Sequence, residues 1–218
     1  MDSEYTVIKC MVFGGYMDTS LNEMTLEELW TLFPIVLSEH KDCWHDWFEE
    51  EQGVLATILS DKEVKISHIG STAISHICAK PIVDILVELP KCSSMTEIKE
   101  KLVNSGYLCM SEACDRVSFN KGYTSNGFSE RVFHLHLRYE GDHDELYFRD
   151  YMNENPEIAK EYEILKLSLW KKFEHDRDAY TEAKSSFVEK YTKIAKEQYK
   201  DRYPMQGSHQ DTISDVNN

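Results

Sequence analysis

The chain has 218 residues, with 24 Lys and Arg against 39 Asp and Glu, so that its formal net charge is −15. This acidic balance disfavours general nucleic-acid binding and a role at a membrane surface, because both partners carry negative charge. No run of about 18 apolar residues is present, so no transmembrane helix is expected. The acidic start lacks the features of a secretory signal, and the six cysteines show no C-x-x-C spacing. The sequence therefore predicts reduced thiols and a cytoplasmic location.

The first part of the chain predicts an extension followed by two helices. Residues 1–22 show no clear period and are expected to form an N-terminal extension. Thr25 followed by Glu28 is a capping-box pattern, which predicts a short helix that ends near Pro34. Aromatic and aliphatic residues then recur at helical spacing, which predicts a second helix over residues 44–59.

The middle of the chain changes to the period of β-strands. Alternating or β-branched segments predict strands at residues 64–70, 82–89, 107–110, 116–121 and 131–138. A helical pattern at residues 96–105, followed by a glycine, predicts one helix between these strands. The Gly- and Ser-rich segment 121–128 is expected to be a flexible loop that can close over a ligand.

The last third returns to helical spacing. It predicts three helices, which begin near Asp142, at Pro156 and at an N-cap formed by Asp178. The polar, aperiodic segment 203–218 is expected to be a disordered tail. Residues 23–202 are thus expected to form one domain in which helices precede and follow a mixed sheet, which is an α+β fold.

The stretch from residue 67 to residue 88 is the most informative for function. Gly70, Ser71 and Thr72 follow a predicted strand and are expected to open a helix. Free backbone N–H groups at such a turn can cradle a phosphate, and the hydroxyl groups add donors. An ordinary tight turn capped by serine is the alternative interpretation.

A carboxylate lies in the middle of the next predicted strand, at Asp84. Burial of a carboxylate there is costly unless a cation or a donor meets it. Asp84 is therefore a candidate ligand for Mg²⁺ or Mn²⁺, and Lys80 is a candidate contact for a phosphate or carboxylate group. The alternative is a structural ion pair between these two residues.

Two histidines, His134 and His136, share one face of the last predicted strand. Histidines with this spacing can bind a metal, act as acid and base, or form hydrogen bonds on a polar face. A zinc site would need a third ligand, which His68 or Asp84 could supply.

The segment from Arg116 to Arg138 carries four basic residues and one acidic residue within an acidic chain. This local excess of positive charge predicts an anion site, to which Arg116, Lys121 and Arg138 would contribute. A solvated edge strand with protective charges is the alternative.

At these residues the chain resembles the GrpB family, through HIGSTAISHICAKPIVDILVE, RVFHLHLR and YFRDYMNENPEIAKEYEILKLSLW. The resemblance covers about residues 23–200 and implies a small mixed sheet of the nucleotidyltransferase superfamily with flanking helices. In that superfamily a Gly-Ser turn grips nucleotide phosphates, and carboxylates on the following strands hold metal ions. Gly70 and Ser71 match the turn and Asp84 matches the first carboxylate, whereas Leu86 stands at the position of the second.

Two main functions are compatible with this resemblance. The first is a metal-dependent nucleotidyltransferase that moves a nucleotidyl group from a nucleoside triphosphate to an unknown acceptor. There Asp84 would hold Mg²⁺ or Mn²⁺, and His136 or His134 would serve as acid or base. The second is a non-catalytic module that binds a nucleotide, a coenzyme-A-like molecule or another anionic metabolite, which the missing carboxylate at Leu86 favours. A metal hydrolase centred on the histidines, with His68 as a further ligand, is a third possibility.

The resemblance, together with the polar face of the last strand, implies that residues of the turn and the two strands line one cleft. Ser71, Asp84 and His136 should line it together, with the side chains of Asp84 and His136 within about 8 Å of each other so that one water or metal ion can bridge them.

Overall fold

The computed structural model of the chain describes residue 21 and residues 24–203. The predicted N-terminal extension and disordered tail lie almost entirely outside these residues. The first half of the described chain contains α2 (Leu26–Leu32), α3 (Cys43–Ile58), β1 (Lys65–Ile69), the short 3₁₀ helix η1 (Ser71–Ala73), β2 (Val83–Leu89) and α4 (Met95–Asn104). The second half contains β3 (Leu108–Glu112), β4 (Arg116–Thr124), β5 (Gly127–Tyr139), α5 (Asp144–Glu154), α6 (Pro156–Lys172) and α7 (Arg177–Gln198).

The five strands form one mixed sheet in the order β1-β2-β5-β4-β3. Strands β2 and β5 pair in parallel, and the other neighbours are antiparallel. This is the predicted α+β fold, with a small mixed sheet between N-terminal and C-terminal helices. None of the described helices is long and apolar enough to cross a membrane.

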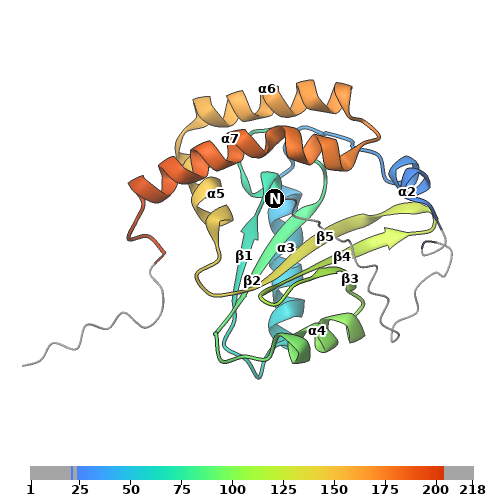
Figure 1. The fold of residues 1–218 in the computed structure, drawn as a ribbon, viewed down its shortest axis with the longest axis vertical. Coiled ribbons are helices and arrows are strands. Elements are labelled where there is room, and N and C mark those ends of the chain that lie inside the picture. The colour runs from blue at the N-terminus through green and yellow to red at the C-terminus, as the bar shows by residue number, and fades with distance from the viewer. Residues whose placement is uncertain (1–20, 22–23, 204–218) are drawn as a thin grey trace, which may run out of the picture.

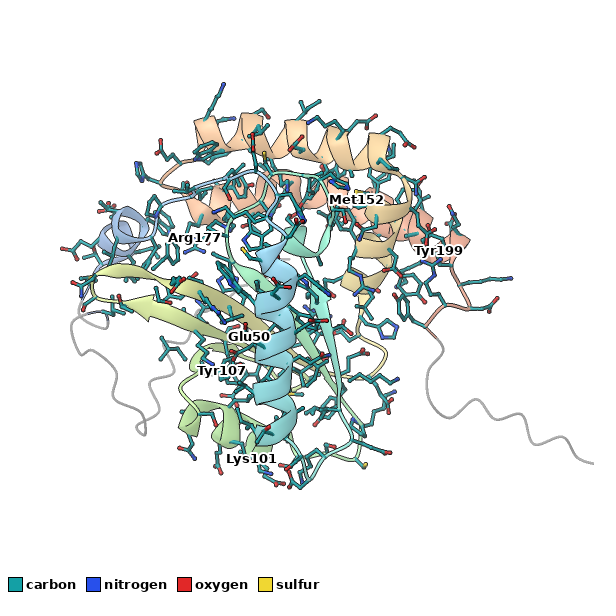
Figure 2. All side chains as sticks on the ribbon, turned by 180° about the vertical axis from the view of Figure 1, so that it is seen from behind. Glu50, Lys101, Tyr107, Met152, Arg177 and Tyr199 are labelled. Atoms are coloured by element: carbon teal, nitrogen blue, oxygen red, sulfur yellow. The ribbon has the colours of Figure 1, made fainter. Side chains whose placement is uncertain are left out.

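One face of the sheet carries the main hydrophobic core. Alternate residues of β2 and β5, such as Ile85 and Leu135, are fully buried there against α3 and α4. Figure 2 shows α3 running across this face of the sheet. Because successive side chains of a strand point to opposite faces, the residues between them must face the other way. These are Asp84 on β2, and His134 and His136 on β5.

The C-terminal helices form the layer beyond this second face. In Figure 1, α6 and α7 lie side by side above the strands, and α5 connects them to the sheet. Aromatic and aliphatic side chains of the three helices pack together in a second cluster, which includes Phe148, Tyr162 and Tyr191. This layer encloses the polar face of the sheet and so creates an interior lined by charged groups.

Three local predictions need correction. The turn after β1 opens only the three-residue η1, because the backbone becomes extended again at Ile74. The expected loop at 121–128 is a tight hairpin instead, since β4 runs to Thr124 and β5 begins at Gly127. The last helix is capped by Asp176 rather than Asp178, with the Asp176 carboxylate accepting a hydrogen bond from the backbone N–H of Ala179 at 2.9 Å.

Candidate functional site

A cavity of about 1000 Å³ lies between the polar face of the sheet and the helical layer. Six of the residues singled out from the sequence line it, namely Gly70, Ser71, Lys80, Asp84, His134 and His136. The opposite wall comes from α5, α6 and α7. The structure thus brings together Ser71, Asp84 and His136, which are far apart in the sequence.

Asp84 stands at the centre of this group. It lies directly opposite His134 in the parallel pairing of β2 with β5. Its Oδ1 atom is 3.3 Å from Nδ1 of His134 and 3.7 Å from Nε2 of His136. Burial alone would raise the pKa of Asp84, but the interactions of its carboxylate with the two histidines outweigh it and hold that pKa well below its usual range. Asp84 is therefore an anion at neutral pH.

Gly70 has a packing reason to be glycine. Its backbone has a φ of 72°, and a Cβ atom placed there would lie 2.2 Å from Oδ2 of Asp84. A larger residue would displace the carboxylate. The Gly-Ser turn therefore fixes the position of Asp84 from one side, while Ser71 remains at the cavity wall.

The second nitrogen of His134 is also engaged. Its Nε2 atom is 2.8 Å from the hydroxyl oxygen of Tyr123, and the same oxygen accepts a hydrogen bond from Nη2 of Arg177 at 3.1 Å. Burial lowers the pKa of His134, against the opposing effect of Asp84, so that the ring is neutral at pH 7. Arg177, the first residue of α7, thus connects the helical layer with the sheet, and Figure 2 marks its place beside the strands.

Tyr123 reaches this face only because β4 contains a bulge. Asn120 pairs with His134 on the cavity face, and Lys121 pairs with Phe133 on the core face. Strict alternation would place Tyr123 on the core face as well. The register shifts between Lys121 and Tyr123, so Tyr123 turns towards the cavity face. Gly122 lies at this shift with a φ of 91°, where a Cβ atom would lie 2.3 Å from the carbonyl oxygen of Arg131.

A group of cations surrounds the cavity. Lys80 lies on the sheet side, and Arg177 and Lys184 lie on α7. The Nζ atoms of Lys80 and Lys184 lie 5.6 Å and 5.1 Å from the centre of the Tyr180 ring. Burial, together with the charges of Lys184 and Arg177, lowers the pKa of Lys80 to about 7. Across residues 24–203, none of these three cations forms an ion pair with a carboxylate.

Lys166 of α6 adds a further amine to the same cavity. Its side chain is almost completely buried, and its Nζ atom donates to the carbonyl oxygen of Cys78. Burial, followed by the charge of Lys184, lowers the pKa of Lys166 to about 7. The cavity also has acidic residues, of which Asp144 pairs with Lys196 and Glu145 pairs with Arg138. Its remaining carboxylates, besides Asp84, are those of Asp178, Glu189 and Glu197.

The basic residues expected from the charge of segment 116–138 lie elsewhere. Arg116 and Arg138 both pair with Asp142, and Lys121 pairs with the buried Glu51 on the core side of the sheet, at 2.6 Å. Their charges are therefore used within the protein, and none of the three lines the cavity. A cluster of cations does line the cavity, but Arg177 and Lys184 of α7 form it with Lys80, and not these three residues.

His68 and Thr72 are also outside the cavity. His68 points to the core face of β1, where it stacks on Phe48 with ring centres 4.8 Å apart. Its Nε2 atom lies 3.0 Å from the hydroxyl of Thr72, which in turn donates to the carbonyl of Ile82. Burial lowers the pKa of His68 to about 4. The sheet separates His68 from Asp84, so of the two residues considered as a third zinc ligand only Asp84 lies beside His134 and His136.

The residues around Asp84 do not fit the two-metal arrangement that the superfamily resemblance implies. Leu86, at the position of the second carboxylate, is fully buried, and Glu88 forms an ion pair with Nδ1 of His143 at 2.7 Å. Histidines stand where a third carboxylate would be needed, and Mg²⁺ prefers oxygen ligands. The described part of the chain contains no group of three or more His, Cys, Asp or Glu side chains that could hold a metal ion.

Comparison with known proteins shows the family. Residues 34–194 match the family described as GrpB protein. The chain belongs to the GrpB family. The glutamate-rich protein GrpB of Alkalihalophilus pseudofirmus is 35% identical over 160 residues, which is 71% of this chain and 92% of that protein.

A solved structure of the same family agrees with this assignment. The conserved protein GrpB from Enterococcus faecalis superposes with a TM-score of 0.65 at 31% identity, over 75% of this chain and 99% of that one. A more distant likeness is to the Cid1 poly(U) polymerase, with a TM-score of 0.43 at 12% identity over 72% of this chain and 51% of that one. The family indicated by the sequence motifs is thus confirmed.

The sequence did not indicate Tyr123, Lys166, Arg177 or Lys184 as members of the site of this GrpB protein. The three basic residues occur in amphipathic helices, where solvated lysines and arginines are common. Tyr123 precedes the hairpin turn, and only the bulge at Gly122 directs it towards His134. A glycine within an alternating strand was the one available signal, because such glycines often mark bulges.

Proposed function

We propose that this GrpB protein binds a nucleotide, or a related phosphorylated small molecule, in the cavity above Asp84. The observation that carries the proposal is the set of three cations, Lys80, Arg177 and Lys184, which line this cavity and form no ion pair with any carboxylate of the described residues. Partly buried cations that repel one another are costly, and an anion between them would remove that cost.

The cations favour a phosphate group in particular. Ammonium and guanidinium groups provide several donors on different sides of one anion, and the hydroxyl of Ser71 provides another. A cavity of about 1000 Å³ has room for a ligand of nucleotide size. The net charge of −15 would keep anions away from most of the surface, so this local positive cluster is the place where one would bind.

Nucleotidyl transfer is a second candidate, favoured by the position of His136 beside Asp84 in the same cavity. In that reaction an acceptor hydroxyl would attack the α-phosphorus of a nucleoside triphosphate, and the bond to the pyrophosphate would break. His136 would take the hydroxyl proton, and Lys80 and Arg177 would balance the charge on the leaving pyrophosphate. Mg²⁺ or Mn²⁺ remains an expectation here, and binding with and without it separates the two candidates.

The proposal is tested by isothermal titration calorimetry with inorganic phosphate, ATP and coenzyme A, each with EDTA and with Mg²⁺. Binding by wild-type protein and at least a tenfold loss of affinity in Lys80→Met would support the cavity site. The matched control is Lys190→Met, which removes an exposed lysine from α7 that does not line the cavity. Failure of all three probes to bind would overturn the proposal, as would equal losses in the two variants.

The catalytic candidate needs a different result. Mg²⁺-dependent ATP binding, followed by release of pyrophosphate with an added hydroxyl acceptor, would support nucleotidyl transfer. Binding that is the same in EDTA and in Mg²⁺ would instead favour a module that binds the anion without this reaction.

A further inference from the structure

Two hydrogen bonds and one ion-pair contact connect Arg177 on the helical layer to Asp84 on the sheet. Nη2 of Arg177 donates to the hydroxyl oxygen of Tyr123 at 3.1 Å, and this oxygen lies 2.8 Å from Nε2 of His134. Nδ1 of His134 lies 3.3 Å from Oδ1 of Asp84. The Tyr123 ring also packs against His134 and Phe33, with ring centres 5.9 Å and 4.7 Å away. The four side chains are thus held in a fixed order.

The chemistry of the first group determines the direction of the others. A guanidinium group can only donate hydrogen bonds, so the oxygen of Tyr123 must accept from Arg177. The single hydroxyl hydrogen of Tyr123 is then free to go to Nε2 of His134. A neutral ring whose Nε2 accepts carries its proton on Nδ1, which faces the carboxylate of Asp84. Both hydrogen bonds therefore point from Arg177 towards His134, and the Nδ1–H of His134 faces Asp84.

We propose that Tyr123 and Arg177 are positioning residues. Together they hold His134 in its Nδ1–H tautomer, so that a ring N–H faces the carboxylate of Asp84. In the superfamily the corresponding carboxylates would bind a metal ion. In this protein the cation is Arg177, which reaches Asp84 through Tyr123 and His134. The inference rests on the proposed function only in taking the cavity as the ligand site.

This arrangement gives the two histidines different tasks. Both ring nitrogens of His134 are engaged, so it has no nitrogen free for a bound molecule. Within residues 24–203, the close polar contact of His136 is with Asp84, through Nε2 at 3.7 Å. His136 is thus the histidine available to exchange a proton with a ligand. Because Arg177 also lines the cavity, an anion that binds Arg177 would alter the hydrogen bond to Tyr123 and, through it, the position of Asp84.

The test is ¹⁵N NMR of the histidine rings in ligand-free protein at pH 7.5. The His134 signals are assigned by their loss in His134→Gln. We expect Nδ1 of His134 to be protonated and Nε2 to be unprotonated, which is the reverse of the tautomer that dominates for free imidazole side chains. In Tyr123→Phe the Nε2 atom loses its donor, and the signals should move towards a mixture of tautomers.

The matched control is Tyr139→Phe. It removes a tyrosine hydroxyl at the far end of β5, which donates to the carbonyl of Ser93, and should leave the His134 signals unchanged. If Tyr123→Phe does not fold, Arg177→Gln serves in its place, since a glutamine amide can donate or accept and no longer fixes the direction.

The wild-type spectrum alone can overturn the inference. A His134 ring protonated on Nε2, or on both nitrogens, would contradict the direction of the chain. A tautomer that persists in both variants would show that Tyr123 and Arg177 do not determine it. These results do not depend on a ligand, so a protein that fails to bind phosphate but shows the predicted tautomer would overturn the proposed function and leave this inference standing.

Discussion

The carboxylate of Asp84 lies directly opposite His134 across a parallel strand pair, with Oδ1 of the one 3.3 Å from Nδ1 of the other. The neutral ring donates to the carboxylate without cancelling its charge. Asp84 therefore presents a negative charge to a cavity that Lys80, Arg177 and Lys184 also line. Removal of the Asp84 charge should therefore change the affinity of the cavity for an anion.

In the absence of metal, Asp84→Asn is expected to strengthen the binding of inorganic phosphate several-fold. The substitution keeps the shape and removes a Coulombic repulsion between two anions. Calorimetric titration in EDTA measures the change. In the presence of Mg²⁺, a loss of ATP binding in the same variant would instead show that Asp84 holds an ion. Unchanged affinity under both conditions would remove Asp84 from the binding site.

The stability of the ligand-free protein should rise between about pH 7 and pH 10. The pKa of Lys80 and that of Lys166 are lowered to about 7, mainly by burial, from the usual 10.5. Between these values the unfolded chain binds more protons than the folded one, so the free energy of unfolding increases with pH. Urea unfolding at several pH values measures this rise. Lys80→Met should make it shallower, and an identical slope in the variant would contradict the assignment.

Lys121→Met is expected to affect stability and not ligand binding. Nζ of Lys121 pairs with the buried Glu51, so its loss leaves that carboxylate with the hydroxyl of Tyr107 as its remaining partner. The free energy of unfolding should fall by roughly 1–3 kcal/mol. Calorimetry at a temperature where the variant remains folded should show the same phosphate affinity as wild type. A large loss of phosphate affinity would show that Lys121 does contribute to the binding site.

Gly122→Ala should destabilise the protein more than Gly106→Ala. Both glycines have a φ near 90°, so alanine is strained at either position. At Gly106 a Cβ atom meets open space, whereas at Gly122 it lies 2.3 Å from a backbone oxygen. Chemical denaturation should therefore show a cost of about 1 kcal/mol or more at Gly106 and a distinctly larger one at Gly122. Equal costs would mean that the bulge adapts.

The polar face of the sheet could be predicted from the sequence because strand alternation is a local property. In β5 it places His134 and His136 on the same side, and in β2 it separates Asp84 from its apolar neighbours. The pairing of β2 with β5 is not local, and only the family resemblance implied that Asp84 and His136 share a cleft. This pairing decides that Asp84 faces His134.

The charged residues were misplaced for the same reason. The excess of positive charge in segment 116–138 was real, but the partner of Lys121 is Glu51, on a helix far away in the chain. Arg177 and Lys184 belong to a helix whose apolar stripe predicted its existence but not the sheet face that it covers. Charge along the sequence shows where cations are, whereas ion pairs decide which of them remain available to a ligand.

The parallel pairing of β2 with β5 also affects how the site forms during folding. The hairpin of β4 and β5 joins residues close in sequence, so it can form early and locally. The contact of Asp84 with His134 closes a loop of about fifty residues, which includes α4 and two other strands. Such a contact costs chain entropy before it gains stability. A partly folded chain can therefore contain the native Tyr123–His134 contact before the binding site has formed. Ligand affinity should recover only with the last, global phase of refolding.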